Sequence, residues 1–87
     1  MKRRNGWQPV LDQEINRWSR KSYDELRAEL SDIQNYQIEF ESKAYQVEVE
    51  LLENTPDYVH VDVRVDDGSL PRSIAPLSAD FVQKRPT

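Results

Sequence analysis

The chain has 87 residues, with 16 acidic and 12 basic side chains, a formal net charge of −4, one His and no Cys. The lack of Cys excludes disulfides, thiolate nucleophiles and thiolate metal sites, and a single His leaves too few ligands for a conventional structural zinc site. A short cysteine-free chain, with no apolar stretch behind its basic N-terminus, predicts a single-domain cytoplasmic protein without a signal peptide or a membrane span.

The charge is unevenly distributed along the chain. Residues 1–21 carry a net +4 (6 basic, 2 acidic), residues 22–67 a net −10 (3 basic, 13 acidic) and residues 68–87 a net +2 (3 basic, 1 acidic). Such asymmetry bears on solubility and partners rather than on fold. Two interpretations are open: the basic ends neutralise the acidic middle within one molecule, or they bind an acidic surface of another copy.

The first predicted helix follows a flexible basic segment, residues 1–8. Leu11, Ile15 and Trp18 recur at helical spacing, which predicts a helix over residues 9–18. The basic residues beside Trp7 and Trp18 form a pattern also found in proteins that bind nucleic acid. The acidic pI of the whole chain and the place of Trp18 in the apolar stripe disfavour that function.

The second predicted helix spans residues 23–33 and has the clearest local signature in the chain. Ser22 followed three residues later by Glu25 is a capping box, and Asp24 adds a negative charge suited to a helix N-terminus. Its apolar stripe consists of Tyr23, Leu26, Leu30 and Ile33. This stripe predicts an amphipathic helix that packs on the rest of the domain.

Three segments then alternate apolar and polar residues with a period of two. They lie at residues 36–41, 45–52 and 58–65. This alternation predicts a three-stranded antiparallel meander with one buried and one polar face. The fold predicted for residues 9–87 is therefore two-layer α+β, with the helices packed on the sheet and an irregular C-terminal tail.

The strand registers depend on where the turns are centred. A turn centred on Ser42–Lys43 pairs apolar residues throughout the first hairpin. A second turn centred on Thr55 places Glu50 opposite His60, and Glu48 opposite Asp62. A shift of two residues in either direction keeps the same faces, so this second register stays open.

The last part of the chain has a weaker pattern. Residues 66–69 read as a turn in which Gly68 takes a positive φ. Pro71 and Pro76 exclude a central strand, which leaves a short edge segment at residues 72–75. The stretch "SADF" at residues 78–81 predicts a capped final helical turn.

The candidate binding surface is the polar face of the sheet, which carries most of the acidic residues of the strands. Its members are Glu39, Glu41, Glu48, Glu50, His60, Asp62 and Arg64. An EF-hand starting at Asp62 fails because Arg64, Asp67 and Ser73 stand where an oxygen ligand, Gly and an acidic residue are needed. The sequence predicts no catalytic residue, no metal site and no cofactor.

These features predict a small non-enzymatic protein that binds another protein and also self-associates into a homo-oligomer, since its core is thin and its first strand leaves a sheet edge open. An alternative is an antitoxin-like or immunity-like inhibitor that uses the acidic sheet face to bind a basic partner. A third is a small enzyme or ligand-binding subunit in which Glu50 orients His60. Neither nucleic acid nor a membrane is an expected partner.

Overall fold

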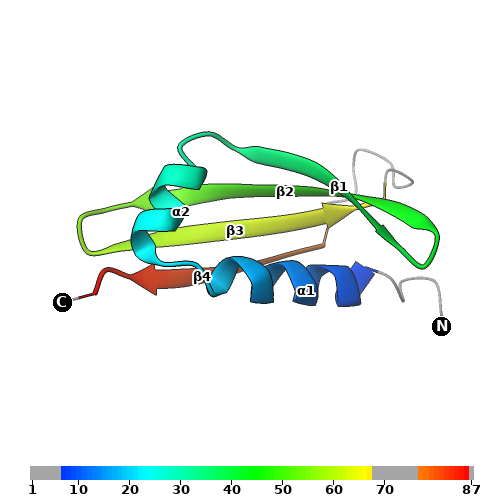
Figure 1. Cartoon of the computed structure of the whole chain (residues 1–87), viewed down its shortest axis with the longest axis horizontal. Coiled ribbons are helices and arrows are strands. Elements are labelled where there is room, and N and C mark those ends of the chain that lie inside the picture. The colour runs from blue at the N-terminus through cyan, green and yellow to red at the C-terminus, as the bar shows by residue number, and fades with distance from the viewer. Residues whose placement is uncertain (1–6, 68–76, 87) are drawn as a thin grey trace.

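The structure, a computed structural model, describes residues 7–67 and 77–86. In these residues two helices pack on one face of a four-stranded antiparallel sheet, giving a two-layer α+β fold (Figure 1). The elements are α1 (Trp7–Ser19), α2 (Tyr23–Glu29), β1 (Gln34–Phe40), β2 (Lys43–Asn54), β3 (Tyr58–Asp66) and β4 (Leu77–Lys84). The strands follow one another across the sheet in chain order, as predicted for a meander.

The fourth strand corrects the prediction of three strands and an irregular tail. The stretch "SADF" lies within β4, which pairs with β3 along its length, so the predicted helical turn is wrong. Leu77, Ala79 and Phe81 do alternate with polar residues, but Val82 falls on the polar side and obscures the period. The structure describes only the first half of the turn predicted at residues 66–69, and there Asp66 belongs to β3. The edge segment predicted at residues 72–75 lies wholly outside the described residues.

Both helices differ from their predicted bounds. Helix α1 begins at Trp7, two residues before the predicted start, and Pro9 is accommodated in its first turn. Helix α2 ends at Glu29 rather than at residue 33, and the Gln34 side chain donates a 2.9 Å hydrogen bond to the Glu29 carbonyl. Ile33 therefore lies beyond the helix and is 49% exposed instead of completing the apolar stripe.

The predicted capping box of α2 is confirmed. The Ser22 hydroxyl accepts a 3.1 Å hydrogen bond from the backbone N–H of Glu25, and the Glu25 carboxylate accepts one of 2.8 Å from the Ser22 N–H. These two bonds satisfy donors that a helix N-terminus leaves unpaired, so the short helix starts at a defined residue.

The β1–β2 turn consists of Glu41 and Ser42, one residue earlier than predicted. Both have positive φ (51° and 66°), the combination of a type I′ turn, whose twist matches that of the strands. As a result Ile38 lies opposite Tyr45 rather than Val47, although the two faces of the hairpin keep their character. Glu41 is a turn residue and is not part of the sheet face to which it was assigned.

The β2–β3 register differs by two residues from the Thr55-centred one. Val63 lies opposite Val49, and a bulge between Leu51 and Glu53 shifts the pairing near the turn. At that turn the Thr55 hydroxyl accepts hydrogen bonds from the backbone N–H groups of Asp57 and Tyr58. These bonds fix the turn type and, with the bulge, determine which polar residues meet across the two strands.

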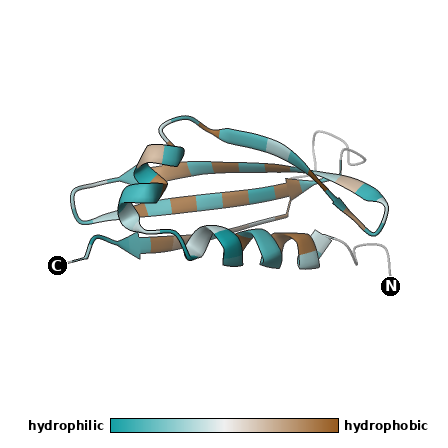
Figure 2. Cartoon of the chain, viewed as in Figure 1, coloured by the Kyte–Doolittle hydropathy of each residue, from teal (hydrophilic) through white to brown (hydrophobic). Residues whose placement is uncertain are grey.

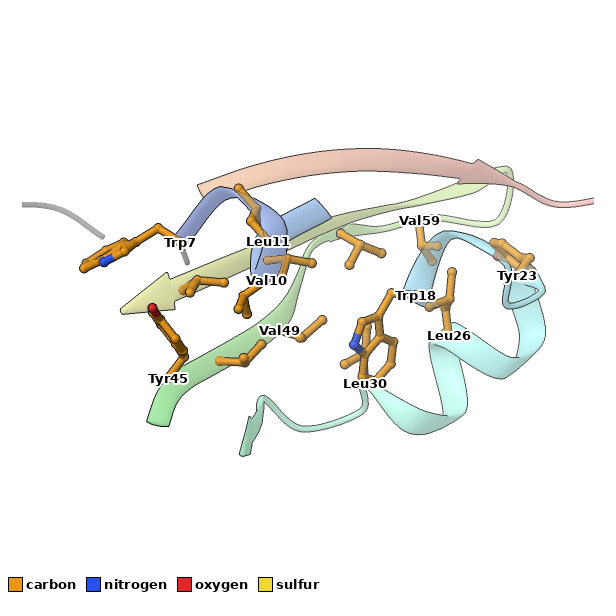
Figure 3. Packing of buried hydrophobic residues seen from close by; sticks show 14 residues of the cluster. Trp7, Val10, Leu11, Trp18, Tyr23, Leu26, Leu30, Tyr45, Val49 and Val59 are labelled. Atoms are coloured by element: carbon orange, nitrogen blue, oxygen red, sulfur yellow. The ribbon is translucent and has the colours of Figure 1, made fainter. Parts of the chain in front are cut away.

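Apolar and polar residues alternate along the strands (Figure 2). The apolar side chains form a core between the helices and the inner face of the sheet (Figure 3). Helix α1 packs on β3 and β4, and α2 packs on β3. The buried apolar residues are Trp7, Val10, Leu11, Trp18, Tyr23, Leu26, Leu30, Tyr45, Val47, Val49, Val59, Val61, Val63 and Val65. Within the described part of the chain, neither helix has the length and apolar character needed to cross a membrane.

Candidate functional site

The face of the sheet opposite the helices, called the open face below, collects most of the candidate residues. Of the predicted set, Glu39 lies on β1, Glu48 and Glu50 lie on β2, and His60, Asp62 and Arg64 lie on β3. Because side chains alternate along a strand, all six project away from the helices. The acidic residues of the open face are Glu39, Glu48, Glu50, Glu53, Asp62, Asp66 and Asp80. Among the described residues, its basic members are Arg64 and Lys84, together with His60.

Three carboxylates form a row across the middle of this face. Asp62 on β3 lies opposite Glu50 on β2 and opposite Asp80 on β4. Like charges placed directly opposite one another destabilise a sheet, so the row has an electrostatic cost that neighbouring cations must offset. The predicted pair of Glu48 and Asp62 does not form.

Arg64 supplies one of the compensating charges. Its guanidinium donates hydrogen bonds of 2.8 Å to Glu48 and 2.9 Å to Glu50, and it lies 3.2 Å from a carboxylate oxygen of Asp62. Partial burial disfavours the charged form of Arg64 and so lowers its pKa. The hydrogen bonds to Glu48 and Glu50 have a larger combined effect in the opposite direction, so the pKa of Arg64 is raised. One cation therefore holds three carboxylates in a fixed arrangement.

Asp62 is the least exposed acid of the row, with 14% of its side chain accessible. Burial raises its pKa, Arg64 lowers it, and the negative charges of Glu50 and Asp80 raise it further, so that the net shift is upward. The ionised form of Asp62 is thus held in an unfavourable environment despite its arginine partner.

His60 does not meet Glu50, so the predicted His–Glu pair is wrong. The strand register and the bulge place Glu53 opposite His60 on β2, and Val82 opposite it on β4. His60 Nε2 lies 2.5 Å from a carboxylate oxygen of Asp80, and Nδ1 lies 3.7 Å from one of Glu53. Both ring nitrogens therefore face carboxylates.

The open face has a hollow of about 120 Å³ near the end of β3, lined by Asn35, Gln46, Val47, Glu48, Arg64 and Asp66. Ligand pockets usually measure several hundred Å³, so this hollow has room for only a few atoms. A larger, open hollow of about 550 Å³ lies at the opposite end of the sheet, where Arg27 and Arg85 approach the β2–β3 turn. His60 and the row of acids line neither hollow.

Of the carboxylates of the open face, those of Glu48, Glu50 and Asp62 contact Arg64, and that of Asp80 contacts His60. Among residues 7–67 and 77–86, no group of three or more His, Cys, Asp or Glu side chains has an arrangement that could hold a metal ion.

A second polar cluster lies between α1 and β1, and the sequence did not point to it. Glu14 is 1% exposed, and its carboxylate accepts a 2.5 Å hydrogen bond from the Tyr36 hydroxyl. That hydroxyl accepts a 2.8 Å hydrogen bond from the indole N–H of Trp18, and the Arg17 guanidinium lies 3.2 Å from Glu14. On α1, Leu11 lies three residues before Glu14 and Trp18 lies four residues after it, and both are buried. The helical period alone could therefore have identified Glu14 as buried.

Two further residues that the sequence did not assign to a site, Glu53 and Asp80, lie beside the ring nitrogens of His60. Glu53 reaches the His only because of the bulge, and Asp80 belongs to the strand that was predicted as an irregular tail. Trp7 and Trp18 are 4% and 3% exposed, so neither ring is available to stack on a nucleic-acid base.

Comparison with known proteins identifies no relative of this chain. No protein-family model, curated protein or solved structure matches the chain.

Proposed function

We propose that this chain is a non-enzymatic protein-binding module whose open face binds a Lys- and Arg-rich surface of another protein. The observation that carries the proposal is the fixed array of carboxylates around Arg64, in which Glu48, Glu50 and Asp62 share one guanidinium. Complementary charge between such surfaces speeds encounter and selects partners.

The arrangement of the acids supports binding rather than scattered surface charge. Holding Asp62 opposite both Glu50 and Asp80 is costly for the isolated protein. A cationic partner surface would reduce that repulsion on binding. The free energy of binding would therefore be more favourable than the direct contacts alone provide. Surfaces that bind nucleic acid are typically Lys- and Arg-rich, so inhibition of a nuclease or a DNA-binding protein fits this charge pattern.

The geometry of His60 supports a binding role over catalysis. Its two ring nitrogens lie near Asp80 and Glu53, and the small hollow of this face is lined by other residues. Ser78, a hydroxyl on the same face, lies opposite Arg64 and is separated from His60 along β4 by Asp80. It is thus not placed to act as a nucleophile with His60.

The test is affinity capture from the native host with three forms of the full chain. One is wild type, one carries Glu48→Gln, Glu50→Gln and Asp80→Asn on the open face, and one carries exposed substitutions elsewhere: Asp12→Asn, Asp24→Asn and Asp32→Asn. The two variants lose the same charge, so a general electrostatic effect would weaken both equally.

We expect a protein with a basic surface to be retained by the wild type and by the control variant, and lost with the open-face variant. Calorimetry with the purified partner should then show affinity falling by about tenfold or more between roughly 50 and 300 mM salt, because salt screens exposed charges. Equal retention by all three forms, or binding insensitive to salt, would show that the open face is not the binding surface.

A further inference from the structure

Strand β1 forms one edge of the sheet, and no strand of the described residues pairs with its outer side. We infer that this edge pairs with β1 of a second copy, antiparallel about a two-fold axis at Gln37, to make a continuous sheet through both molecules. This inference goes beyond the proposed function and does not require a cationic partner on the open face.

The hairpin geometry shows which backbone groups of β1 are available. Phe40 and Lys43 flank a two-residue turn and therefore form a hydrogen-bonded pair. Alternate residues of an antiparallel strand bond to opposite sides, so the N–H and C=O groups of Asn35, Gln37 and Glu39 point outward. A symmetric pairing of these three residues in each copy makes about six hydrogen bonds.

The β1 edge lacks the features that usually prevent edge-to-edge pairing. Its sequence, "QNYQIEF", contains no Lys and no Pro, and its pairing with β2 is free of bulges. Glu39 is its only charged residue. The other edge strand, β4, carries both Asp80 and Lys84, and α1 packs against it.

The inner side of β1 also leaves apolar surface uncovered. The helices pack on β3 and β4, and the inner-facing side chains of β1, Tyr36, Ile38 and Phe40, are only partly buried. Ile33, just before the strand, is 49% exposed. A two-fold axis perpendicular to the sheet brings the same side chains of the second copy to the same face, where the two sets cover each other.

The strand length and its one charge select the register. Placing Gln37 opposite itself pairs all seven residues of β1 and sets Asn35 opposite Glu39 of the second copy. A register with Glu39 opposite itself would bring like charges together and shorten the pairing. On the apolar side the favoured register sets Tyr36 opposite Ile38 of the second copy.

Because residue 37 meets itself at the axis, charge swapping tests both the interface and the register. The full chain is compared by sedimentation velocity over a concentration series as wild type, Gln37→Lys, Gln37→Glu and an equimolar mixture of the two variants. Gln37 is exposed, so neither substitution disturbs the core, and circular dichroism checks the fold. Gln8→Lys, an exposed substitution on α1, is the matched control.

We expect the wild type and Gln8→Lys to dimerise with the same affinity. Each residue 37 variant alone should dimerise about tenfold more weakly or worse, because two like charges meet at the axis, and the mixture should recover the dimer. A wild type that stays monomeric throughout the series overturns the inference. So does a dimer that the residue 37 variants leave unchanged, or a folded mixture that stays as weak as its components.

Discussion

The Tyr36 hydroxyl on β1 donates a 2.5 Å hydrogen bond to the Glu14 carboxylate on α1, at a position where Glu14 is 1% exposed. Burial, together with the hydrogen bond to Glu14, raises the pKa of Tyr36 well above its ordinary value of 10. The same hydroxyl accepts the indole N–H of Trp18, so one oxygen satisfies two buried groups of the helix. The pair thereby joins the helical layer to a strand that the helices otherwise leave partly uncovered.

Replacing Tyr36 with Phe should destabilise the protein. The change removes the donor to Glu14 and the acceptor for Trp18, and a buried polar group left unsatisfied costs about 1–3 kcal/mol. Urea unfolding followed by Trp fluorescence measures the loss. Tyr58→Phe is the control, because that hydroxyl binds Glu53 on the exposed surface. A Tyr36→Phe protein as stable as the Tyr58→Phe protein would contradict the role assigned to this cluster.

Replacing Asp62 with Asn should stabilise the protein at neutral pH. The pKa of Asp62 is raised in the folded state from its ordinary value of 3.8, so the folded state holds this proton more tightly than the unfolded state does. The contribution of Asp62 to the free energy of unfolding is therefore largest below its ordinary pKa. It falls as the pH rises through the pKa that Asp62 has in the folded state.

The Asp62→Asn substitution removes this pH-dependent cost. Its advantage over the wild type should be present at about pH 7 and should disappear near about pH 3, where Asp62 is protonated in both states. Chemical denaturation of both proteins at the two pH values provides the measurement. An Asp62→Asn protein that is less stable than the wild type at neutral pH would mean that the Arg64 ion pair outweighs burial and the neighbouring acids.

Replacing Ser22 with Ala should cost about 1 kcal/mol of stability, because it removes the acceptor for the Glu25 N–H at the start of α2. In a domain of this size such a loss lowers the melting temperature by about 4–8 °C. Calorimetry can compare it with Ser31→Ala, an exposed Ser beyond the end of the same helix. Equal melting temperatures for the two variants would show that the capping box contributes little.

The local patterns of the sequence determined the class of the fold, the capped start of α2 and the faces of three strands. Each depends on residues close together in the chain: the Ser22–Glu25 pair needs only one helical turn, and the valines of β3 need only the period of two. The fourth strand was missed because Val82 breaks the alternation and two prolines precede β4 in the sequence.

Only the tertiary structure decided which polar side chains meet. A two-residue change in register keeps every residue on its face but replaces every cross-strand partner, so hydrophobic pattern cannot select between the two. The positive φ values at Glu41 and Ser42 and the bulge before Glu53 made that selection. The Glu41–Ser42 turn sets the register of β1 with β2, whereas the bulge and the Thr55 turn set that of β2 with β3. In the second register Arg64 lies opposite Glu48 and His60 lies opposite Glu53.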